Sequence, residues 1–315
     1  MPASGVTTAP DVAEPPAAGA TARPARGLVG LRPRTMAARV LPSLLLHAVL
    51  IALATLMVLP LVWTASTSLK SPGDAYAFPP EWLPSWPFYW ENYTKGFSQL
   101  PFGVFYRNTV FLTVAATVGA TFSSALVGYA FARYRAPGSN VVFTILLATM
   151  MIPFQVTMIP QFILFKNLGW VNTFLPLIVP YWLGGGAFYI FLLRQFLRTI
   201  PTDFDNAARI DGANAVQIFR YIVLPLAKPA VATVAIFNFV HHWNDFLGPL
   251  IYLTDDALYT VSLGLRYMQA SGQSGISDVT TLMAMSLVAT LPTIALFFFA
   301  QRQFIQGIVT TGLKG

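Results

Sequence analysis

A long apolar segment near the N-terminus, residues 40–69, contains no Asp, Glu, Lys or Arg. A membrane-spanning helix needs about 20 apolar residues, and the apolar core of a signal peptide is shorter than this segment. We therefore predict an uncleaved transmembrane helix over residues 42–64. The composition agrees, because charged residues make up only 10% of the chain, whereas soluble domains carry roughly 25%.

Five further apolar segments follow and are separated by polar or proline-rich stretches. They cover residues 109–132, 141–164, 174–193, 221–245 and 281–300. The sequence therefore predicts an all-α fold, a polytopic membrane protein with six transmembrane helices in one domain over residues 39–315. Residues 1–38 begin with a stretch rich in Ala, Pro, Gly and Thr, which has little to bury and is predicted to be a disordered leader.

Details of these segments predict how the helices pack. Pro153 and Pro160 interrupt the third span. Small residues in the second span permit close helix packing: Gly119, Ala120, Ser123, Ser124 and Gly128. Residues 65–106 and 248–277 are predicted to be external loops, the first with a short helix over residues 90–97.

The basic residues predict the orientation. With six spans both termini lie on one side, and that side carries 14 of the 19 Lys and Arg residues. The other side has Lys70, Lys95, Arg107, Lys166 and Arg266. By the positive-inside rule, both termini and the 200–220 loop are cytoplasmic. The net charge of +7 is explained in the same way, and without a basic-aromatic platform we predict no nucleic-acid partner.

The 200–220 loop is the most polar stretch between two spans. Its charged residues are Asp203, Asp205, Arg209, Asp211 and Arg220. It is predicted to form two short helices that are separated at Gly212, a residue suited to the left-handed helix stop. Thr202 with Asp205 is a candidate N-terminal cap, and Asn214 with Gln217 is a second one. A pair of short polar helices between two spans is expected to lie at the membrane face and to offer a surface to a soluble partner.

The loop resembles the EAA loop of permease subunits of binding-protein-dependent ABC importers. The matching residues are Ala207, Ala208, Gly212, Ile222, Leu224 and Pro225, whereas Asn206 stands where the motif has glutamate. The rest of the chain, from about residue 40, resembles the maltose-type G subunit of the carbohydrate branch. That resemblance is carried by residues 243–247, Pro249, Leu250, residues 301–307 and the final four residues.

The resemblance implies that the loop docks into a groove of an ATPase subunit. The implied coupling residues are Asp203, Phe204, Asp205, Asn206, Ala207, Ala208, Asp211 and Gly212. Because Asn206 lacks the charge of the motif glutamate, Asp203 or Asp205 is a candidate substitute. The C-terminal residues Gly312, Leu313, Lys314 and Gly315 are expected either to reach the ATPase or to form a frayed end.

The resemblance also implies an assembly. The expected partners are a second permease in a heterodimer, two ATPase subunits, an extracytoplasmic sugar-binding protein and the lipid bilayer. The chain has no Walker A pattern, so no cofactor is expected on it, and ATP and Mg belong to the ATPase subunits. Gly184, Gly185 and Gly186 lie inside a span without a following lysine, and close packing, a kink or a hinge all remain open.

The fifth span ends in His241, His242, Trp243, Asn244 and Asp245. Only one further histidine exists, so a metal site lacks ligands, and a hydrolase would need a nucleophile. We predict neither a catalytic nor a metal site. Either the cluster is a structural polar end, or Asn238, Trp243, Asn244 and Asp245 face a sugar. Met150, Met151 and Gln155 are candidates to share that cavity.

These observations predict a permease subunit, not an enzyme, of an ATP-driven ABC importer for a carbohydrate in the cell membrane. The alternative is a secondary transporter driven by an ion gradient, and an intramembrane enzyme is a third hypothesis. A secondary transporter would need intramembrane carboxylates. No Asp or Glu occurs between Arg107 and Asp203, which disfavours it.

Overall fold

The computed structural model describes residues 36–271 and 279–312, and in these residues the regular structure is entirely helical. The chain divides into two compact units at Met57 and Val58, inside the first helix, α1 (Met36–Ser68). Residues 1–35 of the predicted leader lie outside the described residues, and residues 36–38 are the first of α1.

The helices are long and apolar enough for four membrane spans, or for six if each of two bent pairs counts as one. The four spans are Ser43–Ser68, α3 (Phe102–Arg133), Leu175–Leu197 and Val279–Gln301. The third comprises α6 (Leu175–Gly184) and α7 (Ala187–Leu197), and the fourth is the first part of α14 (Val279–Gly312). The number of spans reaches the predicted six when each of the two bent pairs is counted as one span.

The first bent pair confirms the predicted interruption of the third span at one of its two prolines. Helix α4 (Ser139–Thr149) and helix α5 (Phe154–Asn167) meet at an angle of 100°. The break falls at Pro153, the first of the two prolines that interrupt the segment, whereas Pro160 lies inside α5. A proline has no backbone N–H and disfavours a helical residue before it, which explains the position of the break.

The second bent pair corrects the start of the fifth span. It was predicted to begin at residue 221, but Ala215–Leu226 is a separate helical segment at 81° to α11 (Lys228–Trp243). The short segment comprises α9 (Ala215–Ile218), a π-helical turn η2 (Phe219–Val223) and α10 (Leu224–Leu226). Pro229 occupies the first turn of α11, where its missing N–H costs nothing.

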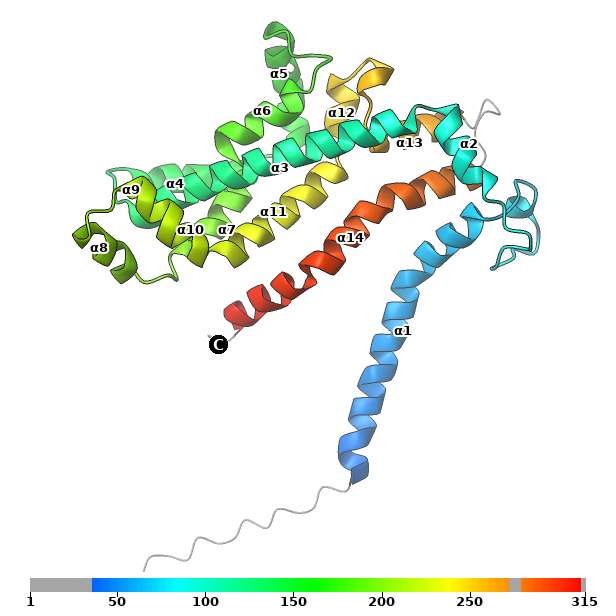
Figure 1. Cartoon of the computed structure of the whole chain (residues 1–315), viewed down its shortest axis with the longest axis horizontal. Coiled ribbons are helices and arrows are strands. Elements are labelled where there is room, and N and C mark those ends of the chain that lie inside the picture. Colours follow the sequence, from blue (N-terminus) through cyan, green and yellow to red (C-terminus); the bar gives the residue numbers. More distant parts are fainter. Residues whose placement is uncertain (1–35, 272–278, 313–315) are drawn as a thin grey trace, which may run out of the picture. The chain divides into compact units, whose positions relative to one another are not determined.

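Helix α3 lies at the centre of the second unit and contacts α6, α7 and α11 (Figure 1). Its predicted small-residue face is confirmed. Ser123 Oγ donates to the carbonyl of Tyr181, at 2.8 Å, and a Cβ atom added at Gly119 would overlap the ring of Trp182. Trp182 Nε1 in turn donates to the Ala115 carbonyl, at 3.0 Å. Small residues on α3 therefore allow α6 to approach its backbone.

The three glycines form the break between α6 and α7. Gly185 has a φ of 64° and Gly186 a φ of 117°, which are left-handed values that suit glycine. A Cβ atom at Gly185 would overlap Ser124 Oγ and lie 2.8 Å from the Ala120 carbonyl oxygen. The predictions of a kink and of close packing are both confirmed, and the hinge stays a prediction.

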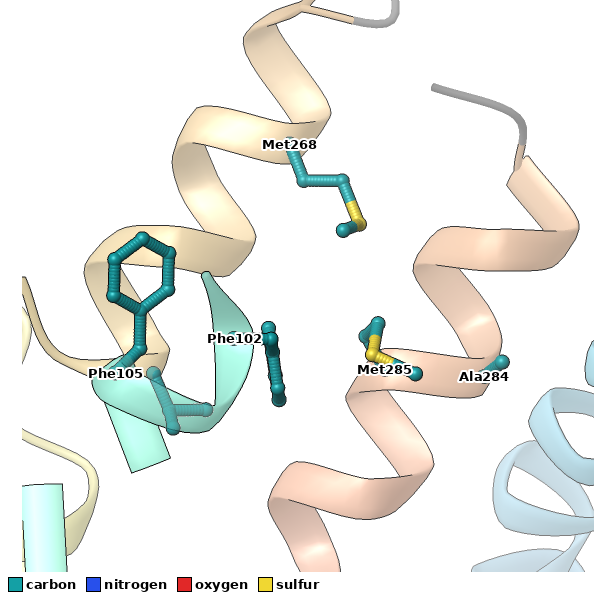
Figure 2. Packing of buried hydrophobic residues seen from close by; sticks show 6 residues of the cluster. Phe102, Phe105, Met268, Ala284 and Met285 are labelled. Atoms are coloured by element: carbon teal, nitrogen blue, oxygen red, sulfur yellow. The ribbon is translucent and has the colours of Figure 1, made fainter. Parts of the chain in front are cut away.

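The segments predicted as external loops contain more helix than expected. In the first, the predicted short helix is α2 (Glu91–Gln99), preceded by the single turn η1 (Asp74–Tyr76), and α3 begins at Phe102. In the second are α12 (Leu247–Tyr252), η3 (Asp256–Leu258) and α13 (Val261–Ser271). Figure 2 shows part of the core that joins α3, α13 and α14. Its labelled residues are Phe102, Phe105, Met268, Ala284 and Met285.

Polar side chains fix the first of these segments. Lys70 is 2% exposed, donates to the Glu81 carbonyl, and its Nζ lies 4.5 Å from the centre of the Trp63 ring. Asn92 donates to the carbonyls of Ser68 and Lys70, both at 2.8 Å. The end of α1 is therefore tied to α2 and to the chain between them.

Candidate functional site

The 200–220 loop folds as predicted into two short helices. Helix α8 (Asp203–Ile210) ends before Gly212, whose φ of 86° is the left-handed stop. The Ala213 N–H then bonds to the Ala208 carbonyl, at 2.9 Å. Helix α9 begins with a complete capping box, because Gln217 N donates to Asn214 Oδ1 at 2.9 Å and Asn214 N donates to Gln217 Oε1 at 2.8 Å.

The other predicted cap is wrong. Thr202 precedes α8, but its side chain makes no capping bond. Asp205 is 2% exposed, and its Oδ2 lies 2.8 Å from Nε of Arg133, the last residue of α3. Arg133 Nη1 also donates to the Ile200 carbonyl, at 3.0 Å. A buried carboxylate gains more from an opposite charge than from an exposed N–H group, which explains why Asp205 turns inward.

An apolar cluster lies behind this ion pair. It comprises Tyr129, Leu197, Ala208, Ile218, Val223 and Ala227. The Tyr129 and Phe219 rings have their centres 5.0 Å apart. Because these residues come from α3, α7, α8, α9 and the turn η2, the cluster joins the loop to the ends of several spans (Figure 1).

Burial divides the predicted coupling residues into two groups. Asp205 and Ala208 are buried and hold α8 in place. The exposed group is Asp203, Phe204, Asn206, Ala207, Asp211 and Gly212. Asn206 Oδ1 lies 3.4 Å from Arg209 Nη1, so the position of the motif glutamate is occupied by a neutral amide beside a guanidinium. Because Asp205 is buried, Asp203 is the remaining candidate substitute for that glutamate.

Two exposed apolar residues of the loop were missed from the sequence. Ile210 is 87% exposed and Val216 is 72% exposed, and they lie on either side of Gly212. Phe204, on α8, is a third exposed apolar residue of the loop, at 50%. Large exposed apolar side chains on an otherwise polar helical pair are candidates for contact with a partner. We call Phe204, Ile210 and Val216 the docking face.

The four predicted substrate-path residues do not form one open patch. Asn238 is completely buried, and Trp243 is 5% exposed, with Nε1 donating to the Ala289 carbonyl at 2.9 Å. Asn244 is exposed, and Asp245 is half-buried and accepts the Gly248 N–H at 3.1 Å. Only Asn244 presents its side chain openly, because the other three pack against neighbouring elements or cap the next turn.

The histidine pair is also part of the packing. The His242 ring is buried and meets the Tyr181 ring edge-on, with centres 4.3 Å apart. No group of three or more His, Cys, Asp or Glu side chains in residues 36–271 and 279–312 is placed to hold a metal ion.

A pocket opens next to the predicted patch, one residue beyond Asp245. Its volume is about 350 Å³, and it lies between α13, α14 and the turn at Phe246. The lining residues are Phe246, Ser262, Leu265, Arg266, Gln269, Leu282 and Ser286. We call it the α13–α14 pocket. The pocket was not predicted from the sequence, because residues 248–277 were interpreted as a loop. The helical spacing of the residues on α13 was therefore not recognised.

The break between α4 and α5 leaves backbone groups unpaired. The carbonyls of Met150, Met151 and Ile152 accept no hydrogen bond from the described residues. Met151 is 84% exposed, and Gln155 is exposed in the first turn of α5. Unpaired backbone inside a membrane is tolerated only where protein covers it or water reaches it.

The predicted C-terminal contact is only partly described. Gly312 is the last residue of α14, and Leu313, Lys314 and Gly315 lie outside the described residues.

Comparison with known proteins identifies relatives. A family model described as binding-protein-dependent transport system inner membrane component matches residues 124–310. The diacetylchitobiose uptake system permease NgcG of Streptomyces coelicolor is 32% identical over 84% of this chain and 87% of its own length. The arabinooligosaccharide transport permease AraQ of Halalkalibacterium halodurans is 33% identical over 79% and 86%. The sn-glycerol-3-phosphate permease UgpE of Salmonella typhi is 34% identical over 68% and 75%.

A solved structure has a similar fold. One chain of a bacterial ABC transporter involved in the import of the acidic polysaccharide alginate superimposes with a TM-score of 0.73. The two chains are 25% identical, and the match covers 85% of this chain and 98% of the other.

Proposed function

Because this chain belongs to the family of binding-protein-dependent transport system inner membrane components, we propose that it is a permease subunit of an ATP-driven carbohydrate importer. Its relatives carry diacetylchitobiose, arabinooligosaccharides and glycerol phosphate. The chain spans the membrane several times, and the distribution of Lys and Arg supports cytoplasmic termini.

The docking face carries this proposal. Phe204, Ile210 and Val216 are exposed on two short helices that a buried ion pair and an apolar cluster hold to the ends of the spans. We expect an ATPase subunit to receive this face. Two such subunits hold ATP and Mg, a second permease completes the translocation path, and an extracytoplasmic binding protein delivers the sugar.

The structure supports a route by which movement passes from the ATPase to the membrane. A push on α8 acts on α3 through Arg133 and on α9 through the cluster. The turn η2 and the 81° bend then join α9 to α11, so displacement of the loop is transmitted to a span. This chain performs no covalent chemistry in the proposal, because hydrolysis takes place on the ATPase subunits.

The broken third span fits the translocation path. Helix α4 follows the basic residues at the end of α3 and has 11 residues, which corresponds to about 16 Å at 1.5 Å per residue. Its end at Thr149 therefore lies near the middle of a hydrocarbon core about 30 Å thick. Unpaired carbonyls at that depth are stable beside water, so we place the α4–α5 break on the aqueous path.

Co-purification tests the proposal. The tagged chain is expressed with its native neighbouring genes, and the ATPase recovered with it is quantified. We expect Ile210→Glu and Val216→Glu to reduce this recovery strongly, because a charge in an apolar contact is costly to desolvate. Leu83→Glu is the matched control, since Leu83 is 73% exposed in the segment between η1 and α2.

Uptake separates the importer from the secondary transporter. Vesicles that contain the whole assembly should lose substrate uptake when ATP is removed and an ion gradient is kept. Uptake that persists under those conditions, together with full ATPase recovery in the Ile210→Glu variant, would overturn the proposed function.

A further inference from the structure

Polar side chains of α13 line one side of the α13–α14 pocket. Ser262, Leu265, Arg266 and Gln269 are spaced at i, i+3, i+4 and i+7, so α13 turns one face toward the pocket. Leu282 and Ser286 face it from α14. The volume of about 350 Å³ lies at the lower end of the range of small-molecule sites. This size accommodates a small saccharide.

Arg266 is the charged residue of the pocket lining. Arg266 is exposed, and no carboxylate of residues 36–271 and 279–312 lies within ion-pair distance of its guanidinium. Its Nη1 donates to Gln269 Oε1, at 3.2 Å. This bond occupies one of the two lone pairs of Gln269 Oε1 and leaves the amide N–H groups and the remaining guanidinium N–H groups available as donors.

The polar side of the pocket therefore offers mainly hydrogen-bond donors. The free groups of Arg266 and Gln269 donate hydrogen bonds and carry a positive charge, which favours a carboxylate or phosphate oxygen over a neutral hydroxyl. The remaining lining is apolar, with Phe246 and Leu282 on other elements and Leu265 beside Arg266 on α13. Such a surface suits the C–H face of a sugar ring, so the pocket combines a sugar-binding wall with an anion-binding one.

The pocket is also tied to the end of the fifth span. Ser262 Oγ donates to the Asp245 carbonyl, at 2.6 Å, and Phe246 follows Asp245 directly. Under the proposed orientation, the pocket lies at the outer end of α14, where a substrate arrives from the binding protein.

We propose that the α13–α14 pocket is an entry site for a small saccharide with an acidic group, and that Arg266 binds that group. The acidic group is a carboxylate or a phosphate ester, which share this recognition chemistry. The inference rests on the proposed function, since it makes the imported carbohydrate an anion.

Protection from a thiol reagent tests the site. The chain has no cysteine, so Ser286→Cys introduces one thiol in the pocket of the complete assembly, with the partners' cysteines replaced. The rate of labelling by a membrane-impermeant maleimide is measured with a disaccharide that contains a uronic acid, its neutral counterpart, a sugar phosphate and inorganic phosphate. Ser262→Cys is a second reporter in case the first does not assemble.

We expect the acidic probes to slow labelling and the neutral disaccharide to have little effect. The two acidic probes distinguish carboxylate from phosphate recognition. Adding Arg266→Gln should weaken protection by roughly ten- to hundredfold, because a charge-assisted hydrogen bond is lost, and Arg266→Lys should restore part of it. Labelling of Ser98→Cys, an exposed residue of α2, should not respond to any probe.

The proposal is overturned if the neutral disaccharide protects as well as the acidic one, if inorganic phosphate alone accounts for the protection, if no probe protects, or if Arg266→Gln leaves protection unchanged. ATP-driven uptake by the unaltered assembly is measured in the same vesicles. Uptake of neutral sugars without protection contradicts only the anion site, whereas the absence of ATP-driven uptake of any saccharide contradicts the proposed function.

Discussion

Arg133 Nε and Asp205 Oδ2 lie 2.8 Å apart at the junction of α3 and α8, and their side chains are 3% and 2% exposed. Asp205 Oδ1 and Arg133 Nη2 have no hydrogen-bond partner among the described residues. Neither charge can therefore be removed alone without leaving the other buried and uncompensated.

Removal of one partner should weaken the loop. Arg133→Met or Asp205→Leu is expected to cost about 3–5 kcal/mol, measured as a lower thermal unfolding midpoint of the purified assembly and a lower number of sugars imported per ATP. Arg133→Met with Asp205→Leu should recover much of the stability. Arg135→Met, at an exposed neighbouring position, should have little effect. Additive losses in the double variant would show that the two residues act independently.

The break between α6 and α7 should not tolerate a side chain at Gly185. Gly185→Ala adds a Cβ atom that overlaps Ser124 Oγ, at a φ of 64°. We expect reduced stability of the assembly, measured by thermal unfolding in detergent, because α3 and α6 must separate. Gly184→Ala is the matched control, since its Cβ would meet nothing within 4 Å. Equal stability of the two variants would contradict the close packing.

The α4–α5 break should be reached by water. Met151→Cys is expected to react with a membrane-impermeant thiol reagent in the assembly, because the position is exposed beside unpaired carbonyls. Val118→Cys, an exposed apolar position within α3, should react much more slowly. If the two cysteines react at the same rate, the break does not lie on an aqueous path.

Asp245 predicts a pH dependence of stability. It lies beyond the last residue of α11, and burial raises the pKa of its carboxyl more than the Gly248 and Leu247 N–H groups and His241 lower it. A raised folded-state pKa means that the stability contributed by this group is present at low pH and is lost as the pH rises through that pKa.

We therefore expect Asp245→Asn to raise the thermal midpoint of the assembly at about pH 8, with an advantage that shrinks toward about pH 4. The amide oxygen can still accept the Gly248 N–H. Uptake should be largely retained, whereas a complete loss of uptake with normal assembly would favour a proton-coupled or catalytic role for Asp245.

Local patterns predicted much of the fold. The apolar segments, Gly212 and the cap of Asn214 and Gln217 depend on nearby sequence, and the structure has them where they were expected. Asp205 was misread because its partner, Arg133, is distant in sequence, and a tertiary ion pair overrode the local capping preference. For Asn238 and Trp243 the sequence left a structural role and a sugar-facing role open, because the pattern of a span does not tell whether a polar or aromatic residue packs inward or faces an opening.

The α13–α14 pocket shows a different limit. Four of its residues lie in the segment 248–277, which was predicted to be an external loop. Once α13 is known to be helical, Ser262, Leu265, Arg266 and Gln269 fall on one face. The residue types are known from the sequence, but the helical structure of this segment was not predicted.

The divided third span also bears on how the protein enters the membrane. Helices α4 and α5 have 11 and 14 residues, and each is shorter than the roughly 20 residues that span a bilayer. Neither helix is long enough to span the bilayer by itself, so we expect the two to insert into the membrane together. Contacts such as those of Phe143 with Phe131 and Phe191 support the pair. A nascent chain that ends at Thr149 would therefore present an incomplete span to the insertion machinery, and a topology reporter fused at that point would describe an intermediate of biogenesis.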